Sequence, residues 1–167
     1  ACQSPSGSCS APFTNHIDPS MRISVPGTAR NVITVGAYST RDLGTQVGAL
    51  ASFSSDGPTR DGRQKPDLAA PGTAIISSLT SGGNPAGDVP QPGGLHTAMQ
   101  GTSMASPHVT GAVALLFEAA PGLDAQGAKT ALTSTTKPAD GFTGSLPNLR
   151  WGAGKVDVFK ALCTGLN

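Results

Sequence analysis

The chain is poor in charged residues, in aromatic side chains and in long apolar runs. Of its 167 residues, 13% are charged and 4% are aromatic, and 11 basic side chains nearly balance 10 acidic ones. A net charge of +1 excludes binding driven by overall charge, so we expect neither a nucleic-acid nor a membrane partner. No segment approaches the roughly 18 consecutive apolar residues that a membrane-spanning helix needs.

Glycine and proline are abundant instead. The 22 glycines and 14 prolines make up about a fifth of the chain, a share that low-complexity sequences also reach. Hydrophobic residues still account for 37% and stand in organised runs, which disfavours disorder. All acidic residues but Glu118 are aspartates, which favour turns and helix caps. We therefore expect one loop-rich domain over residues 1–167, with an irregular segment at 1–21.

The three cysteines leave an odd thiol. Cys2 and Cys9 flank a Pro- and Gly-containing turn, so a local disulfide between them is sterically allowed in an oxidising compartment. The alternative is two free thiols. Cys163 would then be unpaired within the chain or pair outside it, and no Cys and His residues have the spacing of a zinc site.

Apolar periodicity predicts strands separated by helices. Residues 31–38 include four consecutive β-branched side chains and predict a buried strand, and residues 74–79 predict another. Residues 67–72 form a short apolar piece that ends in a Pro-Gly turn. Turn-forming residues predict loops at 55–66 and 80–95. This order is typical of an α/β fold with a parallel sheet.

One long helix is predicted from Thr102 to Ala120, where a Pro-Gly pair ends it. Its faces are nearly all small or apolar, which predicts burial all round and close packing at Gly111. A second helix should begin after an Asp124 cap and reach Ser134, and residues 155–162 should lead from a strand or turn into a helix.

Ser103 stands at the predicted start of the long helix, where free backbone N–H groups favour developing negative charge. Gly101 allows another backbone or a ligand to come close. A serine in this position can attack a carbonyl while its own N–H helps to hold the oxyanion. The alternative interpretation is that Thr102 or Ser103 is only a helix cap.

The segment around Ser103, GTSMASPHVTG at residues 101–111, resembles the nucleophile motif of the subtilisin-like serine proteases, the subtilases. The resemblance covers about residues 23–163 and includes four further blocks: VPG and NVITVGA in 25–37, ASFSSDGP at 51–58, KPDLAAPG at 65–72 and GAGKVD at 152–157. It implies a three-layer α/β/α parallel sheet and a secreted, extracellular endopeptidase that acts on peptides or proteins through an acyl-enzyme.

The chain departs from the family pattern at the rest of the triad. The family carries Asp, His and Ser in that order, but the chain has neither an Asp-Thr/Ser-Gly nor a His-Gly-Thr motif, and the family's oxyanion asparagine segment is missing. The resemblance therefore implies the C-terminal half of a catalytic domain. Its partner would be the N-terminal half, as a separate chain or a cleaved segment, and we expect the isolated chain to be inactive and stable only with that complement. The alternative is a non-catalytic fragment or pseudoprotease module.

The resemblance assigns roles to further residues. Gly101, Thr102, Pro107 and His108 support the motif, and Ser24 belongs to the wall of the substrate pocket. His108 is five positions beyond Ser103 on the helix and points away from it, so we expect a structural core histidine. His96 and His16 are weak candidates for the base, and Asp67 and Asp157 match family blocks as turn and cap residues. No cofactor is required for the chemistry. The resemblance allows structural calcium, but no ligands are predicted.

Overall fold

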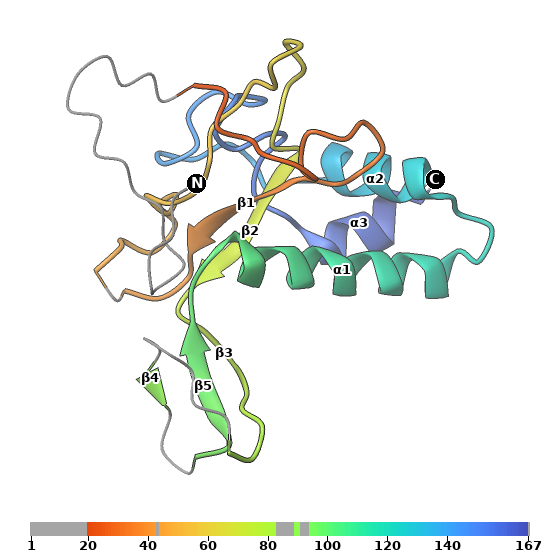
Figure 1. The fold of residues 1–167 in the computed structure, drawn as a ribbon. Helices are drawn as coiled ribbons and strands as arrows, with labels where there is room; N and C mark the ends of the chain where they lie inside the picture. Colours follow the sequence, from red (N-terminus) through yellow and green to blue (C-terminus); the bar gives the residue numbers. More distant parts are fainter. Residues whose placement is uncertain (1–19, 43, 83–88, 91–93, 167) are drawn as a thin grey trace.

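The computed structural model describes residues 20–42, 44–82, 89–90 and 94–166. Within these residues the chain forms a parallel pair of strands, an antiparallel arm and three helices (Figure 1). In chain order the elements are β1 (Val35–Ser39), β2 (Leu68–Thr73), β3 (Ile75–Ser78), β4 (Val89–Pro90), β5 (His96–Met99), α1 (Thr102–Ala119), α2 (Ala125–Ser134) and α3 (Val158–Thr164).

Strands β1 and β2 lie parallel at the centre, with Val35 opposite Leu68 and Ala37 opposite Ala70. Side chains alternate between the two faces of a strand. One set, which includes Ala37 and Leu68, packs with buried residues of all three helices. The other face carries Tyr38 and Ala69 and is covered by Trp151. The α/β class is thus confirmed, and the described residues place helices on one face of the pair and loop segments on the other.

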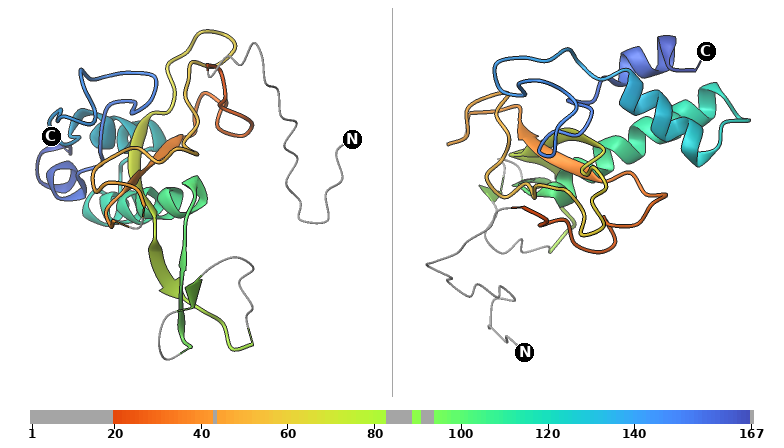
Figure 2. Two further views of the ribbon diagram at one scale, coloured as in Figure 1. Left: turned by 90° about the vertical axis from the view of Figure 1, so that its left-hand side faces the viewer. Right: turned by 90° about the horizontal axis from the view of Figure 1, so that it is seen from above.

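The antiparallel arm consists of β3, β5 and β4 in that spatial order. Ile75 pairs with Met99, and Val89 pairs with Ala98. The arm extends away from the three helices, as Figure 1 and the left view of Figure 2 show. The prediction of a strand at 74–79 is confirmed, but the prediction of a loop throughout 80–95 was incomplete, because Val89 and Pro90 pair with β5.

Two predicted strand boundaries were wrong. The strand predicted from residue 31 begins at Val35. Before it, side chains take up part of the backbone bonding, because Lys65 Nζ donates to the Val32 carbonyl and Thr34 N–H donates to the Asp67 carboxylate. The expected Pro-Gly turn is part of β2, which continues to Thr73.

The loop at 55–66 is confirmed as irregular but lies only partly at the surface. Thr59, Lys65 and Pro66 are buried. Turn-forming residues predict the backbone conformation, but they say nothing about which loop side chains face inward.

Helix α1 ends within one residue of its prediction. Its burial was predicted wrongly, because only the stripe formed by Ala105, Val109, Ala112 and Leu116 is buried. Leu115 is 46% exposed and Phe117 is 40% exposed. Outside the neighbouring helix backbone, no described atom lies within 4 Å of the point where a Cβ on Gly111 would sit, so the close packing expected there is absent.

The two later helices begin as the sequence predicts. Asp124 accepts a hydrogen bond from Gly127 N–H at 2.7 Å, and Asp157 accepts one from Lys160 N–H at 3.0 Å. Each carboxylate satisfies a backbone donor that the first helical turn leaves unpaired. The cap role predicted for Asp157 is therefore confirmed.

Lys155 closes the face of the strand pair opposite the helices. Its ammonium lies 5.2 Å from the ring centre of Trp151 and 5.4 Å from those of Tyr38 and Phe142. Asp140 pairs with it at 2.6 Å. Cation–π attraction holds an ammonium over aromatic rings, and the carboxylate satisfies its charge. The hydrogen bond from Lys155 and two backbone N–H groups lower the pKa of Asp140 to about 2.

This pKa gives a prediction for stability in acid. A carboxyl whose pKa is near 3.8 when unfolded and about 2 when folded stabilises the fold above pH 4 and loses that contribution as the pH falls to 2. We expect Asp140→Asn to lower the free energy of unfolding at pH 6, with the difference from the wild type shrinking toward pH 2. Urea unfolding across this range measures it. Asp42→Asn, at an exposed aspartate without an ion pair in the described chain, is the control, and a pH-independent difference for Asp140→Asn would contradict the prediction.

Gly72 of β2 lies in close contact with Gly101, and this contact fixes where α1 begins. A Cβ on Gly72 would lie 2.6 Å from the Ala37 Cβ and 2.9 Å from the Gly101 carbonyl oxygen. Gly72 also accepts a hydrogen bond from Gly101 N–H at 2.8 Å. Only a residue without a side chain lets the helix start lie this close to the strand.

We expect Gly72→Ala to destabilise the protein by about 1–3 kcal/mol, because the neighbouring backbone must move to admit the methyl group. Gly141→Ala is the matched control: a Cβ there meets nothing within 4 Å, so its effect should lie within about 0.5 kcal/mol. Thermal unfolding of both variants measures the difference. Equal unfolding temperatures would show that the junction tolerates a side chain.

Candidate active site

Ser103 is the second residue of α1, and the residue that caps the helix is Gly101. Gly101 has φ 149° and ψ 162°, a backbone conformation open essentially to glycine alone. Gly101 occupies the N-cap position, and no side chain caps the helix. The alternative that Thr102 or Ser103 serves as the N-cap is therefore wrong. The first helical N–H groups to find partners are those of Met104 and Ala105, which both donate to the Gly101 carbonyl.

The Ser103 hydroxyl is exposed, and no hydrogen bond within the described residues engages it. Its backbone N–H is likewise without a partner in this part of the chain. An unengaged hydroxyl beside an unengaged N–H at a helix N-terminus can attack a carbonyl carbon and donate to the oxygen that becomes negative.

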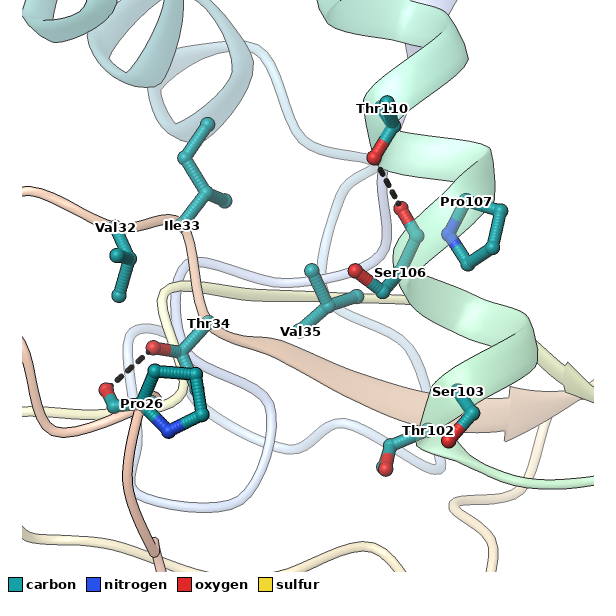
Figure 3. A pocket seen from close by; sticks show the side chains of 11 residues that line it. Pro26, Val32, Ile33, Thr34, Val35, Thr102, Ser103, Ser106, Pro107 and Thr110 are labelled. Atoms are coloured by element: carbon teal, nitrogen blue, oxygen red, sulfur yellow. Dashed lines mark hydrogen bonds between the residues drawn. The ribbon is translucent and has the colours of Figure 1, made fainter.

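Ser103 lies at the rim of two hollows. The first, of about 680 Å³, separates α1 from residues 26–35, and Figure 3 shows Ser103, Ser106 and Thr110 facing the Val32–Val35 segment across it. The second, of about 430 Å³, lies between α1 and the arm and is lined by Ile76, Met99, Met104 and His108. The serine is therefore reachable from both sides of the helix.

A third, smaller hollow of about 180 Å³ adjoins the first. It is lined by residues 23–27, Thr34 and Thr102, among others. Ser24, the predicted wall residue, thus lies in the same hollow as Thr102 of the motif. The structure brings Gly101, Thr102, Ser103 and the Ser24 wall together, and Pro107 borders both larger hollows.

No described histidine is placed to activate Ser103. His108 Nδ1 lies 2.8 Å from the Met104 carbonyl oxygen, one helical turn away, and the ring is exposed, so the expectation of a core position was wrong. The ring borders the hollow of the arm because the helix face around it is uncovered. His96 begins β5, three extended residues before Met99, and the strand carries it away from the helix start. His16 lies outside the described residues.

Asp67 has a role that the sequence did not predict. It was interpreted as a turn residue, but its carboxylate binds two lysines: Lys65 Nζ at 2.5 Å on one oxygen and Lys129 Nζ at 2.8 Å on the other. We call Lys65, Asp67 and Lys129 the lysine clamp. The signal was present in the Lys-Pro-Asp segment, but the second lysine comes from α2, 62 residues later, and only the fold brings it there.

Burial lowers the pKa of Lys65, and the hydrogen bond with Asp67 acts in the opposite direction. Its side chain is 3% exposed. The ammonium is therefore held by its partners and not by water.

Metal ligands and the disulfide are not assigned. Within the described residues no three His, Cys, Asp or Glu side chains gather where they could hold a metal ion, so no residue of this part is named for calcium. Cys2 and Cys9 lie outside the described residues. Cys163 is a free, exposed thiol on α3. None of the described helices is both long enough and apolar enough to cross a membrane.

Comparison with known proteins identifies the family. A sequence profile of the subtilase family, Peptidase S8, matches residues 13–154. Serine protease AprX of Bacillus subtilis (strain 168) is 38% identical over 142 residues, which cover 83% of this chain and 31% of that protein. The minor extracellular protease Vpr of the same organism is 40% identical over 124 residues, covering 72% of this chain and 14% of Vpr.

A solved structure agrees with the fold. The CspB protease of Clostridium perfringens superposes with a TM-score of 0.69 and 31% sequence identity, over 89% of this chain and 30% of that one. The chain thus spans less than a third of the length of each of these three proteins.

The cap at Gly101 gives a prediction for the serine. Gly101→Ala places a side chain at φ 149°, a strain of about 1–3 kcal/mol that the backbone relieves by moving the helix start. A shift of about 1 Å in a reacting group can cost about 100-fold in rate. We therefore expect Gly101→Ala to slow the reaction of Ser103 with a fluorophosphonate by at least tenfold in the complete domain. Gly122→Ala, where a Cβ meets nothing within 4 Å, should react at the wild-type rate. Equal rates for both variants would show that the cap does not position the serine.

Proposed function

The chain belongs to the subtilase family, and we propose that it is the C-terminal half of the catalytic domain of a secreted serine endopeptidase, with Ser103 as its nucleophile. Its family is one of serine proteases. The Ser103 hydroxyl would attack the scissile carbonyl and form an acyl-enzyme, and its backbone N–H would supply one donor to the oxyanion.

The observation that carries the proposal is the start of α1. Ser103 stands on the first turn of a helix, its hydroxyl and N–H have no partner in the described chain, and hollows open on either side. A serine with only a structural role would be expected to cap the helix, but Gly101 does that. The geometry leaves both functional groups of Ser103 available to a substrate.

The base, the triad acid and the second oxyanion donor would come from the N-terminal half. Uncovered apolar side chains support such a complement: Leu115 and Phe117 on the two flanks of α1, and Met99 and Ile76 beside the second hollow, are all more than a third exposed. Large apolar surface of this kind is usually covered by a partner. A segment docked along α1 would bring a histidine to the hydroxyl.

The alternative is a module without activity, in which Ser103 is never activated. It is favoured by the absence of any histidine or carboxylate bonded to Ser103 among the described residues. Both proposals agree that the chain alone is inactive, so the decisive observation is made with the complement present.

We propose secretion because two of the relatives are named as extracellular proteases. Vpr is named as an extracellular protease, and so is a relative from Xanthomonas campestris that is 34% identical over 145 residues. The substrate would be a peptide or protein, held against the wall that contains Ser24.

The test is covalent labelling with a fluorophosphonate probe. Alone, the chain should label at background level, because an unactivated serine is a poor nucleophile. With the N-terminal half present, Ser103 should label, and Ser103→Ala should abolish labelling while the complex stays assembled.

Ser106→Ala is the matched control, since Ser106 faces the same hollow one turn along the helix and should not react. If the isolated chain labels at Ser103 as fast as the complex does, a base lies within these 167 residues and the proposed division of the site is wrong. If Ser103 does not label in the assembled complex, the non-catalytic alternative holds.

A further inference from the structure

The lysine clamp grips the backbone that lines the first hollow. Lys65 Nζ and Lys129 Nζ donate to one acceptor, the Val32 carbonyl, at 2.9 and 3.2 Å. Each ammonium also pairs with its own oxygen of Asp67. Two ammonium groups, one carboxylate and one carbonyl thus form a closed ring of bonds, and the carbonyl is that of Val32 in the loop beside the first hollow.

Asp67 also holds Thr34, two residues further along the same loop. Asp67 Oδ2 accepts from Thr34 N–H at 2.7 Å, and Asp67 N–H donates to the Thr34 carbonyl at 2.8 Å. Thr34 in turn donates from its hydroxyl to the Gly27 carbonyl at 2.7 Å, a bond drawn in Figure 3. A chain of short bonds therefore links the clamp to Gly27, at the end of the wall that contains Ser24.

A further cation holds the outer part of this loop. Arg63, which is paired with Asp61 at 2.8 Å, donates from Nη2 to the Thr28 carbonyl at 2.7 Å. No described strand pairs with residues 28–34. Apart from the bond from Asp67 N–H to the Thr34 carbonyl, the groups from elsewhere that bond this backbone are side chains.

Stability alone is a weak reason for this arrangement. The Lys65, Asp67 and Lys129 side chains are 3%, 10% and 17% exposed, and burying two cations with one anion carries a large desolvation cost. Apolar side chains of similar size commonly replace buried ion pairs without loss of stability. What an apolar set cannot do is donate hydrogen bonds to the Val32 carbonyl and accept one from Thr34 N–H.

We propose that Lys65, Asp67 and Lys129 are positioning residues for substrate binding: the lysine clamp holds the loop 24–34 at the distance from Ser103 that the substrate side chain requires. This inference rests on the proposed function, because it assigns the loop as the wall of the substrate pocket. The clamp touches neither the substrate nor the reacting atoms. Its loss should therefore weaken substrate binding without changing the chemistry at Ser103.

Lys129→Met in the complete domain tests the proposal, because Lys129 is the most exposed member of the clamp and methionine keeps the apolar stem. For a peptide p-nitroanilide with a large apolar residue before the scissile bond, we expect KM to rise about 5- to 20-fold, within the range that a misfitted apolar contact costs. The kcat value should stay within about twofold of the wild-type value. Labelling of Ser103 by a small alkyl fluorophosphonate, which fills no side-chain pocket, should be unchanged.

Two variants make the result specific. Lys129→Arg retains a cation that can reach Asp67 and should recover at least half of the lost binding free energy. Lys160→Met, at an exposed lysine of α3 whose side chain has no partner in the described chain, should match the wild type. An unchanged KM for Lys129→Met, or a parallel fall in kcat and labelling, would overturn the positioning role.

Amide hydrogen exchange separates this inference from the proposed function. In Lys129→Met we expect residues 28–34 to exchange at least tenfold faster than in Lys160→Met, with α1 unaffected. If the wild-type complex neither labels nor cleaves peptides, the proposed function fails, and the exchange rate of this segment still decides whether the clamp holds the loop. Unchanged exchange would refute the clamp even in an active enzyme.

Discussion

The close approach of two glycines, Gly72 on β2 and Gly101 before α1, is the constraint on which the rest of the structure depends. The 2.8 Å hydrogen bond from Gly101 N–H to the Gly72 carbonyl leaves no room for a Cβ at Gly72. It fixes where α1 begins and at what height above the sheet. The position of Ser103 depends on this contact, because the residue is two positions further on and has no side-chain bond of its own in the described chain.

The sheet and the loop before it are held by different forces. Leu68, Ala70 and Ala37 pack on the helices through apolar contact, which depends on burial and not on direction. The loop at 28–34 packs on this core only through Ile33, and its backbone is held by directed bonds from Arg63, Lys65 and Lys129 and by those to Asp67. A wall that must keep its shape at the edge of an open hollow needs directed bonds. The chain has few charges, and it places several of them here.

Much of this architecture could be predicted from the sequence, and the exceptions have common physical causes. Helices that begin at Asp124 and Asp157 were predictable because a cap is local chemistry. The length of β2 and the burial of Lys65 were not, since both depend on which segment lies opposite. Ser103 was predictable as a candidate because a helix start and a motif coincide there. The clamp was not, because Lys129 lies 62 residues from Asp67 and meets it only in three dimensions.

The burial of α1 that its sequence predicts exceeds the burial observed in the described chain. A helix that is small and apolar all round is built to be covered all round. In the described chain one stripe is covered, by β1, β2 and the other helices, while Leu115, Phe117 and the empty space beside Gly111 face outward. The sequence of α1 is thus suited to more neighbours than these residues supply. Ser103 likewise has an unengaged hydroxyl and N–H, and no described histidine lies where it could activate the serine. In the proposed function both features have one explanation: the N-terminal half would supply the base for Ser103 and would cover the uncovered flanks of α1.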